Sequence, residues 1–120
     1  MRGSTEAQDI DDPIVSVALK YIAANIEKPY DVEHLLKVTR VSRQTLNLHF
    51  NKSLRCTPLM EIRRQRVERA KHLLATTNDH SKSIAAKCGI NHQITFFHLF
   101  KEMTGITPQE YRSRAQNLNF

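Results

Sequence analysis

Two short segments of the chain combine hydrogen-bonding and apolar side chains at helical spacing: 43-RQTLNLHFN-51 and 92-HQITFFHLFK-101. Residues two positions from a buried one lie roughly 200° around a helix of 3.6 residues per turn. Burial of Leu46 and Phe50, and of Phe96 and Phe100, would hold each helix against a core. The outward side chains are then Arg43, Gln44, Asn47, Leu48 and Asn51 in the first segment, and Gln93, Ile94, Phe97, His98 and Lys101 in the second. Because Gln and Asn pair bidentately with adenine, and apolar groups contact the thymine methyl, these faces have the chemistry of base recognition.

The charge of the chain favours an anionic partner. Its 120 residues include 18 Lys and Arg against 12 Asp and Glu, a net charge of +6 with a pI near 9.6. A surplus of this size is typical of small nucleic-acid-binding domains, although charge alone also serves solubility. Charge therefore supports base recognition without establishing it.

Nothing in the sequence predicts a metal, a cofactor or an enzyme. Cys56 and Cys88 have no partner at zinc-ligand spacing, and no two of the six histidines lie four residues apart on a predicted helix. No nucleophile–base pair, phosphate-binding loop or apolar run of membrane-spanning length occurs. Two free thiols in a reducing cytoplasm are the expectation.

The pattern predicts an all-α fold of seven helices, because glycines and β-branched runs are few. The first helix is expected over about Pro13–Glu27 after the N-cap Asp12, and the longest over Pro58–Thr76. The remaining helices start after Asp31, after Ser42, before Ile84, near Gln93 and at the Thr107–Glu110 capping box. The longest helix buries Ile62, Val67, Ala70, Leu73 and Leu74, and its other faces carry Arg63, Arg64, Arg66, Arg69 and Lys71. The second helix is expected to bury Leu35 and Leu36.

A weak internal repeat relates the two halves. Phe50 and Phe100 lie fifty residues apart, as do Leu46 and Phe96, whereas Val41 and Ile90 lie forty-nine apart. A short helix, a tight turn and a longer helix thus occur twice, which is the helix-turn-helix motif. The predicted organisation is a leader (1–11), a first helix-turn-helix subdomain (12–56), a linker helix (57–77), a second subdomain (78–116) and a tail (117–120).

The second half, 84-IAAKCGINHQITFFHLFKEMTGITPQEYR-112, resembles the signature of the AraC/XylS family of bacterial transcription regulators. The matching residues are Ile84, Ala85, Gly89, Phe96, Phe100, Lys101, Gly105, Thr107, Pro108, Tyr111 and Arg112. The first half matches at Leu36, Ser42, Leu46 and Phe50, the linker matches over 66–77, and coverage extends over about residues 13–114.

The resemblance implies sequence-specific binding of double-stranded DNA, with two recognition helices in successive major grooves about 34 Å apart. The implied base-contacting positions are Gln44, Asn47, Leu48, Gln93, Ile94, Phe97 and His98, to which Arg43 is added from its place on the helix. Contacts to the DNA backbone are expected from Ser42, Asn51, Lys82, Asn91, His92 and Lys101. The sequence departs from the family where Leu48 and His98 replace frequent arginines, and in the turns at Arg40-Val41 and Ile90.

The resemblance also implies partners and a location. Such modules are usually joined to a sensor domain, which this chain does not include, and RNA polymerase is a second candidate partner. The linker phrase EIRRQRVERAKHLLATT is similar to sugar-responsive members such as the xylose-operon regulators. We expect a monomer for this module, a dimer for a longer protein, and a cytoplasmic, nucleoid-associated activator. The alternative is a helical protein–protein adaptor in which Ile94 and Phe97 anchor a partner and the basic charge is incidental.

Overall fold

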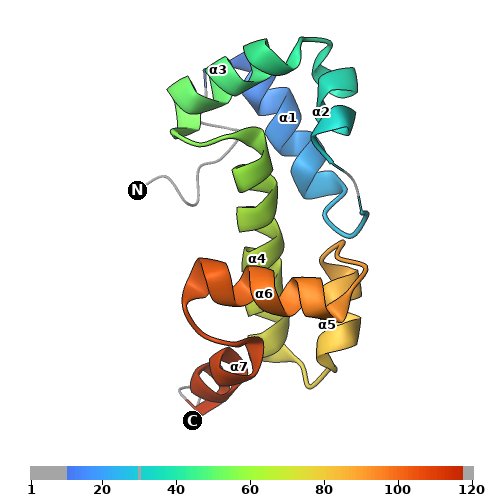
Figure 1. The fold of residues 1–120 in the computed structure, drawn as a ribbon, viewed down its shortest axis with the longest axis vertical. Coiled ribbons are helices and arrows are strands. Elements are labelled where there is room, and N and C mark those ends of the chain that lie inside the picture. Colours follow the sequence, from blue (N-terminus) through green and yellow to red (C-terminus); the bar gives the residue numbers. More distant parts are fainter. Residues whose placement is uncertain (1–10, 30, 118–120) are drawn as a thin grey trace. The chain divides into compact units, whose positions relative to one another are not determined.

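The computed structural model describes residues 11–29 and 31–117, and within these ranges it consists of seven α-helices and no strand (Figure 1). The helices are α1 (Pro13–Ala24), α2 (Val32–Thr39), α3 (Arg43–Leu54), α4 (Pro58–Thr76), α5 (Ser81–Lys87), α6 (Gln93–Thr104) and α7 (Pro108–Asn117). This confirms the predicted all-α fold of seven helices. The predicted leader (1–11) and tail (117–120) lie outside the described residues, apart from Asp11 and Asn117.

The helix starts follow the predicted capping residues. The Asp12 carboxylate accepts hydrogen bonds from the N–H groups of Ile14 (2.9 Å) and Val15 (3.3 Å). Thr107 and Glu110 form the expected reciprocal pair, at 2.9 and 3.1 Å, which satisfies two N–H groups at the start of α7.

The end of α1 differs from the prediction. The helix stops at Ala24 rather than Glu27, because the side-chain amide of Asn25 donates to the carbonyl of Tyr21 at 3.0 Å. Asparagine side chains compete in this way with backbone hydrogen bonds and favour helix ends.

The chain packs as two compact units that divide within α4. Among the described residues, unit 1 comprises 11–25 and 31–62, and unit 2 comprises 26–29 and 63–117. In unit 1, α1 packs on α2 and α3, and in unit 2, α6 packs on α5 and α7 (Figure 1).

Each unit has its own hydrophobic core. Leu46 and Phe50 are buried in unit 1, and Phe96 and Phe100 in unit 2, as predicted. The core of unit 2 is completed by Val67, Ala70, Leu74, Ile84, Ala85, Cys88 and Ile90. Leu36 and Leu73, which were predicted to be buried, are half-buried.

The helix bounds and caps confirm the internal repeat. α3 and α6 each have 12 residues and start fifty positions apart, whereas α2 and α5 start forty-nine positions apart. The C-caps of these two helices also correspond. Arg55 after α3 and Gly105 after α6 both have a left-handed backbone conformation, with φ of 59° and 86°. In the turns before these helices, Arg40 (φ 60°) corresponds to Gly89 (φ 78°).

Replacing Arg55 by glycine is expected to raise the stability of unit 1 by about 1 kcal/mol, because a side chain disfavours left-handed backbone. Thermal unfolding followed by circular dichroism measures the change. The control is Lys52→Gly at an exposed position inside α3, where glycine is expected to lower stability by about 1 kcal/mol. A lower melting temperature for Arg55→Gly would contradict the proposed strain.

Candidate nucleic-acid interface

Helix α3 is held in unit 1 by its apolar side. Leu46, Phe50 and Leu54 are buried, and the Ser42 hydroxyl accepts the N–H of Thr45 at 3.1 Å at the start of the helix. The residues predicted to contact DNA bases or backbone at this helix are all exposed, namely Ser42, Arg43, Gln44, Asn47, Leu48 and Asn51.

Helix α6 repeats this arrangement in unit 2. The ring of Phe100 lies 5.9 Å from that of Phe96 and 5.7 Å from that of Tyr111, centroid to centroid, which fixes the inner side of the helix. The residues predicted to contact DNA bases or backbone at this helix are again all exposed, namely Asn91, His92, Gln93, Ile94, Phe97, His98 and Lys101. His92, the N-cap, makes no side-chain capping hydrogen bond.

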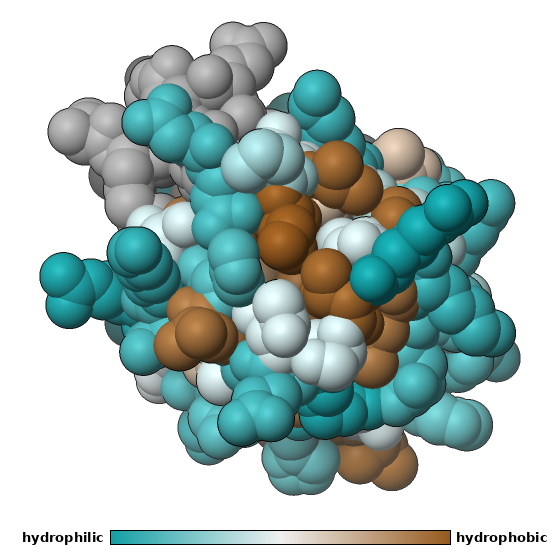
Figure 2. Space-filling model, turned by 90° about the horizontal axis from the view of Figure 1, so that it is seen from above, coloured by the Kyte–Doolittle hydropathy of each residue, from teal (hydrophilic) through white to brown (hydrophobic). Residues whose placement is uncertain are grey.

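Large apolar side chains are exposed on both outward faces. Leu48 on α3 is 66% exposed and Ile94 on α6 is 73% exposed, the two highest values among the exposed large apolar residues of the described ranges. Phe97 is also exposed and makes an edge-to-face contact with the His98 ring at 5.5 Å. Figure 2 shows hydrophobic side chains gathered among hydrophilic ones on one face of the molecule. Single exposed apolar residues are common, but their place beside amides suits contact with base edges.

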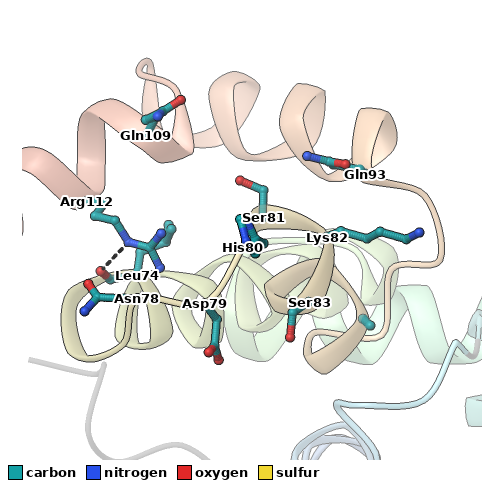
Figure 3. Close-up of a pocket in the computed structure, with 11 residues that line it drawn as sticks. Leu74, Asn78, Asp79, His80, Ser81, Lys82, Ser83, Gln93, Gln109 and Arg112 are labelled. Atoms are coloured by element: carbon teal, nitrogen blue, oxygen red, sulfur yellow. Dashed lines mark hydrogen bonds between the residues drawn. The ribbon is translucent and has the colours of Figure 1, made fainter.

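A cavity in unit 2 brings two of the predicted residues together. It has a volume of about 960 Å³, and both Lys82 at the start of α5 and Gln93 at the start of α6 line it (Figure 3). Gln109 and Arg112 of α7 lie on another side of the same cavity. The Arg112 Nε donates to the Leu74 carbonyl at 3.3 Å, which ties α7 to the end of α4.

The basic residues of α4 include one correction. Arg66 was predicted on an outer face of the helix, but it is buried, with 7% exposure. Its guanidinium donates to the carbonyls of Cys88 (3.2 Å), Gly89 and Lys28 (3.4 Å). The spacing of Ile62, Arg66 and Ala70 could have predicted this burial, because residues four apart share one face of a helix.

Other cations of α4 also have partners within unit 2. Arg69 forms an ion pair with Glu27 at 2.8 Å and donates to the Lys87 carbonyl at 2.9 Å. Lys71 forms an ion pair with Glu68 at 3.0 Å. Arg63 is exposed.

Two contacts that sequence reasoning missed connect α3 to its neighbours. The Arg43 guanidinium forms an ion pair with Glu33 of α2. His49 Nδ1 lies 2.6 Å from the Asp12 carboxylate at the start of α1. Although partial burial acts to raise the pKa of Asp12, the hydrogen bonds from His49 and from the backbone of Val15 and Ile14 hold it below its ordinary value.

The remaining candidate chemistries find no support in the part of the chain that the structure describes. Among residues 11–29 and 31–117, no three His, Cys, Asp or Glu side chains gather into a possible metal site. No helix in these ranges has both the length and the apolar content that a bilayer crossing requires. Burial raises the pKa of the Cys88 thiol to about 11, so this cysteine is a core residue rather than a nucleophile.

The fold and the outward faces define a double helix-turn-helix module. A family model described as a helix-turn-helix domain matches residues 35–114, and the chain belongs to this family, the AraC-type helix-turn-helix DNA-binding domains. Membership also confirms the prediction of a transcription-regulator module rather than an enzyme.

Named relatives and solved structures agree with this family. The chain is 31% identical to the xylose operon regulatory protein of Escherichia coli (strain K12) over 111 residues, covering 92% of this chain and 28% of that protein. It therefore spans less than a third of the length of that relative. It is similar to the DNA-binding domain of AdpA, a global transcriptional factor solved in complex with a target DNA, with a TM-score of 0.81, 25% identity, and coverage of 89% of this chain and 96% of that one. It is also similar to the xylose-binding transcription activator xylR, with a TM-score of 0.76, 30% identity, and coverage of 92% of this chain and 29% of that one.

Proposed function

We propose that this module binds double-stranded DNA sequence-specifically, with α3 and α6 in successive major grooves, and regulates bacterial transcription. The observation that carries the proposal is the division of both helices into a buried apolar side and an exposed side of amide, basic and apolar residues. An α-helix with such an exposed side fits the major groove, where base edges present hydrogen-bonding groups and thymine methyls.

The proposal assigns roles to the exposed side chains. Bases are contacted by Arg43, Gln44, Asn47, Leu48, Gln93, Ile94, Phe97 and His98. The DNA backbone is contacted by Ser42, Asn51, Lys82, Asn91, His92 and Lys101. The cavity in unit 2 supports these two roles, because Lys82, a candidate phosphate contact, and Gln93, a candidate base contact, both line it.

Removing a side chain that contacts a base is expected to lower the affinity for one DNA sequence more than the affinity for others. Gln93→Ala and Asn47→Ala should each cost about 1–3 kcal/mol on a duplex selected by the wild-type chain from a random pool, and much less on an unrelated duplex. Lys101→Ala should weaken binding to both duplexes alike and reduce the slope of log affinity against log salt by about one. Mobility shifts at several salt concentrations measure both quantities.

Matched controls are available on exposed positions outside these faces. Asn117→Ala at the end of α7 and Lys20→Ala on α1 should leave affinity and salt slope unchanged. Equal losses on both duplexes for Gln93→Ala would remove its assignment to base recognition. Binding that is insensitive to salt and sequence would favour the protein–protein adaptor, anchored by Ile94 and Phe97.

We propose further that the module acts with a sensor domain, in a protein that dimerises, engages RNA polymerase and works as an activator on the cytoplasmic nucleoid. The length of the xylose operon regulatory protein, of which this chain matches 28%, supports additional domains. The module by itself is proposed to bind as a monomer, because it contains two helix-turn-helix motifs. A sugar is the proposed class of effector, on the basis of the xylose-responsive relatives.

A further inference from the structure

The first helices of the two helix-turn-helix motifs, α2 and α5, carry opposite charges at one equivalent position. Glu33 is the second residue of α2, and Lys82, forty-nine positions later, is the second residue of α5. Both side chains are exposed, so the repeat presents opposite charges at matching places. The N-cap residues of these two helices differ as well. The Asp31 carboxylate caps α2, whereas His80, the N-cap of α5, makes no capping hydrogen bond with its side chain.

The same contrast extends over the whole of each unit. Among the described residues, unit 1 has six Lys and Arg and five Asp and Glu, whereas unit 2 has eleven and five. The net charge is therefore +1 for unit 1 (6 minus 5) and +6 for unit 2 (11 minus 5). Since phosphate contacts supply affinity that does not depend on sequence, unit 2 is better suited than unit 1 to hold any duplex.

Glu33 also contacts a candidate base-reading residue. Its carboxylate forms an ion pair with Arg43, the first residue of α3, although both side chains stay largely open to solvent at 61% and 51% exposure. Exposed ion pairs contribute little to fold stability. The contact does, however, restrict the rotamers of Arg43 and offset its charge before any DNA arrives.

We propose that Glu33 is a specificity-determining residue of the first helix-turn-helix motif, which holds Arg43 toward bases and weakens the attraction between unit 1 and phosphates. This inference rests on the proposed function. A duplex with the wrong bases is held mainly by unit 2, because unit 1 adds little net positive charge and the carboxylate of Glu33 repels phosphates. A duplex with the right bases engages both units, because base contacts outweigh that repulsion.

The test compares Glu33→Gln with the wild-type chain on two duplexes of equal length, one enriched from a random pool and one unrelated. Glu33→Gln should raise affinity for the unrelated duplex about two- to fivefold, the range of one exposed charge interaction, and raise affinity for the enriched duplex less. The ratio of the two affinities should therefore fall. In an Arg43→Ala background the same substitution should change the ratio less.

The matched control is Lys82→Gln, which should lower affinity for both duplexes equally and reduce the salt slope by about one. Circular dichroism melts should show that neither variant loses structure. If the wild-type chain prefers the enriched duplex but Glu33→Gln leaves the affinity ratio unchanged, the proposed role of Glu33 is wrong and the proposed function stands. A wild-type chain that binds neither duplex would overturn the proposed function as well.

Discussion

Replacing Gly89 by alanine is expected to lower the free energy of unfolding of unit 2 by about 3 kcal/mol, because strain and overpacking act together. The φ of Gly89 is 78°, in the left-handed region that side chains disfavour. A Cβ at this position would lie 2.7 Å from the carbonyl oxygen of Ile26 and 2.8 Å from that of Lys28, both backbone atoms. It would also lie 2.5 Å from Nη1 of Arg66. Urea unfolding followed by circular dichroism measures the loss.

Gly105→Ala is the control for this experiment. Its φ of 86° is similar, but a Cβ there would have no neighbour within 4 Å. The expected cost is therefore about 1–2 kcal/mol, from backbone strain alone. Equal losses at the two glycines would show that the close approach at Gly89 has no energetic consequence. Hydrogen exchange should locate the Gly89→Ala effect in α5 and α6 rather than in α2 and α3.

Replacing Arg66 by methionine is expected to destabilise unit 2 by a similar amount, about 3 kcal/mol. The substitution keeps an apolar stem of similar length but removes the donors to the carbonyls of Cys88, Gly89 and Lys28. Buried acceptors that lose a charged donor bear their full desolvation cost. The same unfolding measurement applies, with the transition of unit 2 expected at lower urea.

Arg63→Met provides the comparison on the same helix. Arg63 is exposed, so this variant should change stability by no more than about 0.5 kcal/mol. Arg66→Lys should fall between the two, because an ammonium retains the charge but lacks the planar fork that reaches several carbonyls. If Arg66→Met unfolds at the same urea concentration as the wild-type chain, the predicted contribution of these hydrogen bonds to stability would be wrong.

Local signals were sufficient to predict most of the fold. Asp12, Ser42 and Thr107 mark helix starts because a side chain satisfies N–H groups within three residues, a relation that the sequence shows directly. Phe50 and Phe100 could be placed in the cores because helical spacing fixes which side of a helix a residue occupies. The exposed faces of α3 and α6 followed from the same geometry.

The features that were missed depend on contacts between distant parts of the chain. The Glu33–Arg43 ion pair joins two helices of one motif, and no spacing rule predicts it. Arg66 was assigned outward because it is charged, whereas it follows the buried stripe and satisfies carbonyls more than twenty residues away. Charge indicates exposure only where no buried acceptor competes for the side chain.

The buried thiol of Cys88 has a consequence for reactivity. Burial raises the pKa of this thiol to about 11, so the thiol form is favoured at neutral pH, and the side chain is fully covered. Oxidants and alkylating reagents therefore reach this sulfur only when the surrounding helices part. The rate at which Cys88 is modified therefore reports how often unit 2 opens transiently.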